Sequence, residues 1–200
     1  MKIRITPGFV LLTAAWYLFD PSGLFWCAVP AIALHECGHL LAIRALGGNA
    51  GRLTLSAAGL RIDYRGALSY PAEFGIAVAG AAANLLCALA CGIALRLTGR
   101  TDLAYFAGTS LLFAAVNLIP ASPLDGGEAL RAVLYRYFGP ETAPRVFRTI
   151  SIIFSAALFI FGLYIAFKTR YNSTVMILGG LLLAGNTVNT KEWNPLWTSV

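Results

Sequence analysis

Residues 33–41 read ALHECGHLL, and this stretch contains His35 and His39, the two histidines of the chain. Positions four apart lie on the same face of a helix, so both imidazoles can offer a nitrogen to one metal ion. Glu36 projects about 100° away from His35, beside the open coordination position. Two His ligands on Zn²⁺, with a Glu that takes a proton from the attacking water, form a hydrolytic site. The stretch therefore predicts a helix that carries zinc chemistry.

The residues around this pattern are apolar, which bears on the alternative that HExxH arose by chance on a core helix. Two His and a Glu at membrane depth are costly unless they are paired, bound to a metal or facing water. Ionisable groups in such a position are therefore candidates for function. The apolar surroundings favour a site over a chance match.

Composition places the chain among membrane proteins. Charged residues make up 12% of the chain and hydrophobic residues 58%, whereas soluble domains average about 25% charged residues. This balance is typical of an all-α polytopic membrane protein. Membrane spans nearly fill the 200 residues, so we expect a single domain over 1–200 and no appended soluble domain. The motifs that carry chemistry fall within residues 30–130.

Six apolar segments are candidates for the membrane spans, since a helix needs about 20 residues to cross the hydrocarbon core. They cover residues 3–19, 24–46, 74–97, 103–119, 147–167 and 175–188. The first segment follows Lys2 and Arg4 and so resembles a secretory signal. No small-x-small cleavage site occurs before Asp20, and we expect a retained first span.

The distribution of Lys and Arg predicts the orientation. In the six-span scheme, 11 of the 15 basic residues fall on the side of the amino terminus, namely Lys2, Arg4, Arg44, Arg52, Arg61, Arg65, Arg131, Arg136, Arg145, Arg148 and Lys191. By the positive-inside rule, both termini are cytoplasmic and the protein lies in the cell membrane. The net charge of +6 then reflects topology and contact with anionic lipid. The basic residues form no single face, and we expect no nucleic-acid partner.

A third zinc ligand has to be a carboxylate or a cysteine, because no further histidine exists. In the six-span scheme His35 and His39 lie in the membrane toward the cytoplasmic side. Among the carboxylates on that side are Asp125, Glu128 and Glu73, whereas Asp20 and Asp102 fall on the opposite side.

Asp125 is the preferred third ligand because of the sequence around it. The fourth span ends in NLIPASPLDGG, residues 117–127, where two prolines stop the helix before Asp125 and two glycines permit a tight backbone path after it. Non-helical backbone at membrane depth is tolerated where it is packed in protein or lines a watery cavity. The alternative is an ordinary turn at the membrane interface, in which Asp125 caps its own backbone.

Three motifs together resemble one family. HECGH at 35–39, GAAAN at 80–84 and NLIPASPLDGG at 117–127 are similar to those of the site-2 proteases, the intramembrane zinc metalloproteases. The resemblance implies one Zn²⁺ per chain bound by His35, His39 and Asp125, with Glu36 as the catalytic acid and base. The six-span layout, with no inserted PDZ domain and no CBS domain, resembles the sporulation-type subgroup.

The GAAAN motif departs from the family pattern Gly-Pro-x-x-Asn, because Ala81 stands where proline is usual. The spacing from Gly80 to Asn84 is retained, so a small-residue contact and a polar amide remain available. We expect Asn84 to contact substrate or active-site water and Asn117 to contact substrate, and both amides are candidate donors to the oxyanion. The alternative for the motif is a packing face of small residues on the third span.

Residues 52–64 lie between the second and third spans and predict a small membrane-associated β-hairpin. Apolar and polar residues alternate on both sides of a turn that contains Gly59. The resemblance implies that a sheet edge here holds an unwound substrate segment by strand addition. The alternative is a hairpin that only caps the helices.

Three further segments have structural interpretations. Residues 128–138 predict an amphipathic interfacial helix, and the tail from Trp193 to Trp197 predicts an interfacial anchor. Cys27, Cys37, Cys87 and Cys91 lie in apolar segments and are expected to be small packing residues rather than ligands or disulfides. Cys37 is expected to point away from the histidine face.

The predicted function is zinc-dependent endoproteolysis of a transmembrane or membrane-associated protein, in regulated intramembrane proteolysis. A cytoplasmic fragment would be released, and a regulatory membrane partner is possible. Three alternatives remain open. The first is a prenyl-protein type of membrane zinc protease, the second a zinc-binding membrane protein without enzymatic activity, and the third a transporter that uses His35, Glu36 and Asp125 as an ion path.

Overall fold

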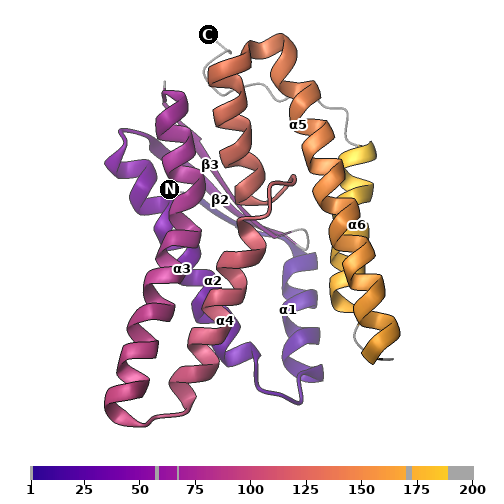
Figure 1. Cartoon of the computed structure of the whole chain (residues 1–200). Coiled ribbons are helices and arrows are strands. Elements are labelled where there is room, and N and C mark those ends of the chain that lie inside the picture. Colours follow the sequence, from indigo (N-terminus) through magenta and orange to yellow (C-terminus); the bar gives the residue numbers. More distant parts are fainter. Residues whose placement is uncertain (1, 57–58, 67, 170–172, 189–200) are drawn as a thin grey trace. The chain divides into compact units, whose positions relative to one another are not determined.

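The computed structural model describes residues 2–56, 59–66, 68–169 and 173–188. Within these ranges the chain forms six helices and three strands (Figure 1). In order they are β1 (Lys2–Ile5), α1 (Pro7–Phe19), α2 (Phe25–Ala45), β2 (Asn49–Ser56), β3 (Gly59–Arg65), α3 (Tyr70–Thr98), α4 (Asp102–Asn117), α5 (Asp125–Thr169) and α6 (Thr174–Val188). The expected tail anchor from Trp193 to Trp197 lies outside the described residues.

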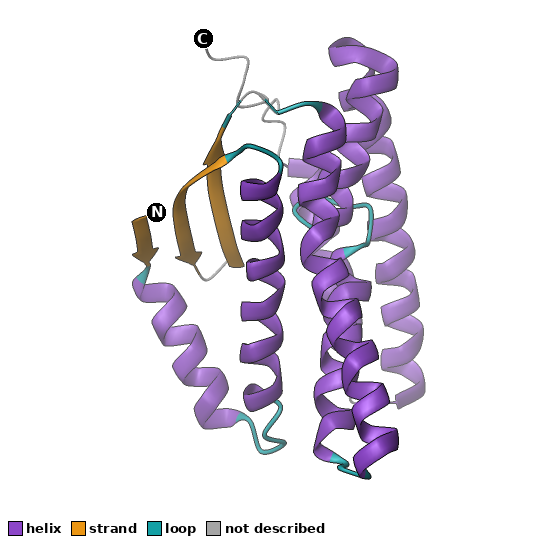
Figure 2. Ribbon diagram, turned by 90° about the vertical axis from the view of Figure 1, so that its left-hand side faces the viewer, coloured by secondary structure: helices purple, strands orange, loops and turns teal. Residues whose placement is uncertain are grey.

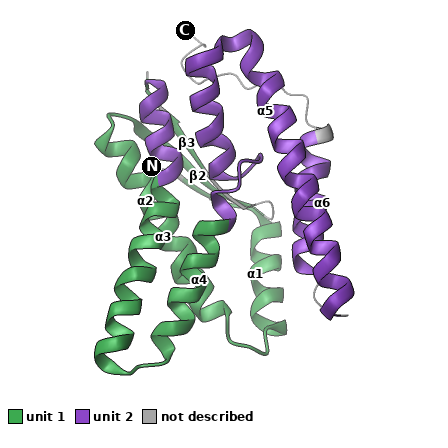
Figure 3. Ribbon diagram, in the orientation of Figure 1, with its two compact units in different colours: residues 1–68, 79–115, 196–200 green, residues 69–78, 116–195 purple. Residues whose placement is uncertain are grey.

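The chain divides into two compact units, coloured separately in Figure 3. Unit 1 contains residues 1–68 and 79–115, and unit 2 contains residues 69–78 and 116–195, apart from the undescribed positions. Unit 1 therefore holds the sheet, α1, α2 and most of α3 and α4, while unit 2 holds the start of α3 and the end of α4 with α5 and α6. The prediction of a single domain over 1–200 stays a prediction.

Three of the helices are long and apolar enough to cross a membrane, namely α2, α3 and α5. α1 and α6 are shorter apolar helices, and the 16 residues of α4 also fall just below the roughly 17 residues that a crossing requires. The prediction of a helical membrane protein with a small β-hairpin between the second and third helices is confirmed. The number of crossings stays a prediction.

The first expected span is wrong at its start. Lys2–Ile5 is a strand, and α1 begins only at Pro7. The Lys-Ile-Arg-Ile alternation has the period of a strand, and proline is favoured at the first position of a helix. Thr6 separates the two elements: its backbone N–H donates to the Leu55 carbonyl at 2.9 Å, and its hydroxyl accepts from the Phe9 N–H at 3.4 Å.

The expected hairpin is present as β2 and β3, and it belongs to a larger sheet (Figure 2). The strand order is β1-β2-β3, with β1 parallel and β3 antiparallel to β2. Leu53 is opposite Ile3 on one side and Ile62 on the other. Because β2 is paired on both sides, only β1 and β3 present an outer edge.

α5 changes direction at Gly139, whose φ is 69° and ψ is 175°. Positive φ is accessible to glycine at little cost, and Pro140 follows directly. The kink separates two parts that correspond to the expected interfacial helix and fifth span. In the first part Tyr137 is exposed, whereas Tyr135 and Leu134 are buried against Ala143 and Phe147 of the second part.

The second part of α5 packs closely along α6 (Figure 1). A Cβ built on Gly162 of α5 would lie 2.2 Å from the backbone nitrogen of Met176, and one on Gly179 of α6 would lie 2.5 Å from that of Phe159. Both glycines therefore allow backbone approach that any side chain would prevent, as is usual for helix pairs in membranes.

Candidate metal centre

His35 and His39 belong to the buried stripe of α2, which also contains Ala28, Ala31 and Ile43. The stripe repeats every three to four residues, as one face of a helix requires. The Nε2 atoms of the two histidines are 3.1 Å apart, and the ring planes are inclined at 77° with centroids 4.7 Å apart. The two imidazoles therefore present the same nitrogen toward one point.

α3 approaches the two histidines at glycine positions. A Cβ on Gly80 would lie 2.4 Å from His39 Nε2 and 2.7 Å from His35 Nε2. A Cβ on Gly38 would lie 2.6 Å from the Ala79 carbonyl oxygen. The HECGH and GAAAN motifs therefore approach each other closely, and the space in front of the imidazole nitrogens depends on the absence of a side chain at position 80.

Asn84 lies one helical turn after Gly80 on α3 and is fully buried. Its Nδ2 is 3.5 Å from His35 Nδ1, and its Oδ1 is a buried atom that has no hydrogen-bond partner among the described residues. Amide nitrogen and oxygen are interchangeable by a half-turn of the side chain. After such a rotation the orphaned oxygen would accept a hydrogen bond from His35 Nδ1–H. The predicted contact of Asn84 with substrate stays a prediction.

Glu36 and Cys37 occupy other faces of α2. Glu36 is half-buried, whereas Cys37 is exposed and lies away from the histidine stripe as expected. The Sγ atoms of Cys87 and Cys91 are 4.0 Å apart on α3, and among the described residues neither belongs to a group of three possible metal ligands.

Asp125 is the first residue of α5 and follows a loop over residues 118–124. At the start of this helix the Leu124 carbonyl accepts hydrogen bonds from the N–H groups of Gly127, at 2.9 Å, and Glu128, at 3.2 Å. A Cβ on Gly126 would lie 2.2 Å from the Leu118 carbonyl oxygen. The two glycines after Asp125 are therefore needed for close packing of the first turn against the loop.

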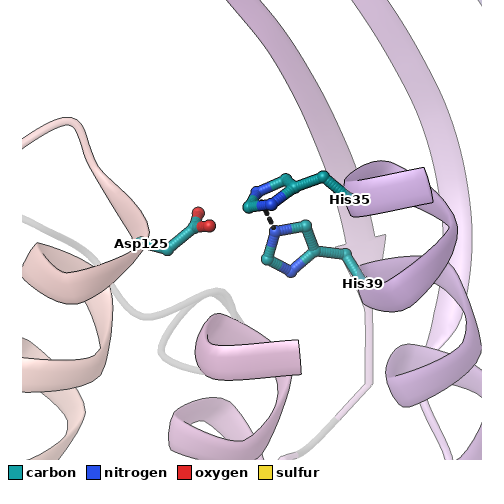
Figure 4. Close-up of side chains that lie close together, drawn as sticks. All are labelled: His35, His39 and Asp125. Atoms are coloured by element: carbon teal, nitrogen blue, oxygen red, sulfur yellow. Dashed lines mark hydrogen bonds between the residues drawn. The ribbon is translucent and has the colours of Figure 1, made fainter. Parts of the chain in front are cut away.

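His35, His39 and Asp125 are the group among the described residues that could hold a metal ion, drawn in Figure 4. One ligand atom from each lies within 4.8 Å of the other two, and Asp125 is half-buried. Glu73 and Glu128, the other candidates for third ligand, are not part of this group. Asn117 is the last residue of α4, half-buried at the start of the loop.

The carboxylates that the topology set aside as ligands have local partners. Asp20 accepts hydrogen bonds from the Ser22 hydroxyl and from the Phe25 N–H, which lowers its pKa. Asp102 is bound by Arg100, with 2.6 Å between Nη2 and Oδ2, and this pairing lowers the pKa of its carboxyl. Each carboxylate therefore forms hydrogen bonds within a connection between two helices, α1 and α2 for Asp20 and α3 and α4 for Asp102.

Comparison with known proteins gives relatives in sequence and in structure, although no family model matches. The chain is 31% identical over 219 residues to Rip3 of Mycobacterium tuberculosis, a protein assigned as a zinc metalloprotease, covering 92% of this chain and 55% of that protein. It is 24% identical over 152 residues to the zinc metalloprotease MJ0392 of Methanocaldococcus jannaschii, covering 71% of this chain and 44% of the relative. The chain thus spans about half of the length of the curated relatives it matches.

The solved structure of a site-2 protease from Methanocaldococcus jannaschii matches with a TM-score of 0.69 and 20% sequence identity. The match covers 96% of this chain and 92% of the solved chain. At this identity the likeness establishes the fold. It extends over nearly all of both chains, and not only over the motif-bearing segment.

Proposed function

We propose that this chain, which shares the fold of a site-2 protease and has relatives assigned as zinc metalloproteases, is a zinc endopeptidase that cuts protein substrates within the membrane. The observation that carries the proposal is the group formed by His35, His39 and Asp125. Two imidazole nitrogens and one carboxylate oxygen are a usual ligand set for catalytic zinc, which leaves a position open for reaction.

The geometry of the histidine pair fits such an ion. Two nitrogen ligands about 2.0–2.1 Å from a tetrahedral zinc lie roughly 3.3 Å apart, and the Nε2 atoms of His35 and His39 are 3.1 Å apart. Gly80 leaves the space in front of these nitrogens open. Asn84 provides the partner that a zinc-bound histidine commonly has on its other nitrogen.

The chain's own groups then have distinct tasks. Zinc, when bound, would polarise the scissile carbonyl and activate a water molecule. Glu36 would accept the proton of the attacking water and deliver it to the leaving amine. Asn84, by accepting from Nδ1–H, would keep the Nε2 lone pair of His35 directed at the metal. Asn117 is retained as a candidate substrate contact.

Peptide hydrolysis requires an extended substrate segment, and the sheet offers a way to hold one. Since β1 and β3 already pair with β2, a substrate strand would add at an outer edge, and β3 is the candidate for this role. The substrate class is a transmembrane or membrane-associated protein. The active site would face the cytoplasmic side, with both termini cytoplasmic, and release a cytoplasmic fragment under the control of a membrane partner.

The deciding experiment compares the wild type with Glu36→Gln in the full chain, purified with zinc, on a single-span reporter. We expect both proteins to bind zinc and only the wild type to cleave the reporter, because glutamine cannot carry the proton. Equal cleavage by both would refute the proposed mechanism. Zinc binding without cleavage by either would favour a non-enzymatic zinc protein, and ion flux in vesicles without cleavage would favour a transporter.

A second comparison addresses the third ligand. Asp125→Asn should lower zinc occupancy, because a neutral amide oxygen is a weaker ligand than a carboxylate. Unchanged occupancy would move the assignment to Glu128 or Glu73. A prenyl-protein type of protease would require a Glu in this role, so the same result would also revive that alternative.

A further inference from the structure

The loop of residues 118–124 interrupts the helical structure directly before Asp125, and its backbone needs hydrogen-bond partners. Pro120 and Pro123 have no N–H group to contribute, and irregular backbone at membrane depth cannot rely on bulk water. A buried carbonyl left without a donor costs about 1–3 kcal/mol. The donors that reach this loop therefore decide whether it holds one conformation.

Two carbonyls of the loop are satisfied locally. The Ile119 carbonyl accepts from the Ala121 N–H at 2.8 Å, and the Ala121 carbonyl accepts from the Leu124 N–H at 2.9 Å. These two hydrogen bonds fold the loop into successive turns. The carbonyls of the residues that follow these two acceptors, Pro120 and Ser122, need donors from elsewhere.

Side chains from distant parts of the sequence supply those two donors. The Ser151 hydroxyl of α5 donates to the Pro120 carbonyl at 3.4 Å, and the Asn186 amide of α6 donates to the Ser122 carbonyl at 3.1 Å. Ser151 is fully buried and Asn186 is 7% exposed. The four consecutive carbonyls of residues 119–122 therefore each accept a hydrogen bond. Two of these bonds come from side chains of α5 and α6.

Asn186 is itself held in place before it meets the loop. Its Nδ2 also lies 2.7 Å from the Leu182 carbonyl and 3.4 Å from the Ser155 hydroxyl. Gly179, two turns earlier on α6, brings the helix to within backbone contact of α5. The packing of α6 against α5 thus fixes the position of the Asn186 amide, and the amide in turn fixes the Ser122 carbonyl of the loop.

We propose that Asn186, assisted by Ser151, is a positioning residue for Asp125, an inference that rests on the proposed function. The mechanical link is the first turn of α5, where a Cβ on Gly127 would lie 2.7 Å from the Ala121 carbonyl oxygen. The loop and this turn touch without intervening side chains. A shift of the Ser122 carbonyl therefore displaces the turn that begins with Asp125, and with it the carboxylate that binds zinc.

The test measures the zinc dissociation constant of the full chain in detergent by competition with a chromophoric chelator. Asn186→Leu keeps a similar volume and removes the donor. We expect it to raise the zinc Kd about tenfold, the lower end of the range for residues that support metal ligands. Ser151→Ala should raise the Kd by a smaller factor. Its matched control is Ser110→Ala, a fully buried serine without a hydrogen-bond partner, which should leave the Kd unchanged.

A double variant separates positioning from general loss of structure. In an Asp125→Asn background, Asn186→Leu should add no further loss of zinc affinity, whereas an effect of equal size there would overturn the inference. An unchanged Kd in both Asn186→Leu and Ser151→Ala, with a raised Kd in Asp125→Asn, would overturn this inference and leave the proposed function standing. If Asn186→Leu does not fold, Ser151→Ala decides. A wild type that binds no zinc would overturn both proposals.

Discussion

At the scale of single residues, the site depends on a side chain that is absent. Gly80 faces the Nε2 atoms of both histidines at distances that leave no room for a methyl group. We expect Gly80→Ala to raise the zinc Kd by at least tenfold, because a displaced ligand cannot reach its coordination distance. Zinc competition titration measures the effect.

Gly92 is the matched control for this substitution, since it lies on the same helix and a Cβ there would meet nothing within 4 Å. Gly92→Ala should leave the zinc Kd unchanged and slightly raise the unfolding temperature, as alanine is favoured over glycine inside helices by roughly 0.5–1 kcal/mol. Equal zinc affinity in Gly80→Ala and Gly92→Ala would contradict the assignment of Gly80.

Asn84 gives a second prediction at this scale, which concerns the direction of one hydrogen bond. If Asn84 accepts from His35 Nδ1–H, Asn84→Asp should bind zinc as tightly as the wild type or more tightly, since a carboxylate is a better acceptor. Asn84→Leu should weaken zinc binding by 10-fold or more, on the order of other losses behind a metal ligand. Equal weakening in both variants would mean that Asn84 donates to His35 instead.

At the scale of elements, the contact between α5 and α6 makes a prediction about stability. Gly179→Ala places a methyl group against the backbone of Phe159, 2.5 Å from its nitrogen if nothing moves. Overpacking of this kind costs about 1–3 kcal/mol, so the free energy of unfolding should fall by that amount. Gly185→Ala on the same helix meets nothing within 4 Å and should not be destabilised. Unfolding in denaturant measures both, and equal stability would show that the helices can separate at Gly179.

Short patterns identified the candidate metal ligands and made most elements predictable, whereas pairing between distant segments could not be predicted. HExxH and PLDGG are local signals, so His35, His39 and Asp125 could be proposed from spacing and residue chemistry alone. The strand at Lys2–Ile5 was missed because its partner, β2, is about 50 positions away, and an apolar run with two basic residues is also typical of a span start. The alternation of residues 2–5 was the available signal.

The roles of Asn84 and Asn186 could not be predicted for a related reason. A polar residue in an apolar helix indicates function or helix contact, but it does not identify the partner. Asn84 was expected to meet substrate, which stays a prediction, and its proximity to His35 was not foreseen. No role was predicted for Asn186, although a single amide side chain in the apolar helix α6 is a sequence feature that could have indicated one. The partners of both residues depend on which helices and loops pack together. The spacing of residues within one helix does not reveal this.

At the scale of the whole molecule, metal removal links the site to overall stability. A ligand that binds only the folded chain stabilises it by mass action, by about 2.7 kcal/mol at 100 times the dissociation constant. Adding zinc to metal-free protein should therefore raise the unfolding temperature of the wild type. The rise should be smaller in Asp125→Asn, because its affinity is lower. A rise of equal size in a variant that lacks both His35 and His39 would mean that zinc binds elsewhere.

The orientation in the membrane gives the last prediction, and two exposed positions in unit 1 can report it. Asn49 begins β2 after the turn that follows α2, and Thr101 lies in the short connection between α3 and α4. If both termini are cytoplasmic, these positions lie on opposite sides of the membrane, because α3 crosses between them. After replacement of the four cysteines by serine or alanine, Thr101→Cys should react with a membrane-impermeant thiol reagent on intact cells, and Asn49→Cys only after permeabilisation.

The reverse pattern would place the termini outside and would move Glu36, with the histidines beside it, to the half of the membrane away from the cytoplasm. Reaction of both positions on intact cells would mean that α3 does not cross, even though its 29 residues exceed the roughly 20 that a crossing needs.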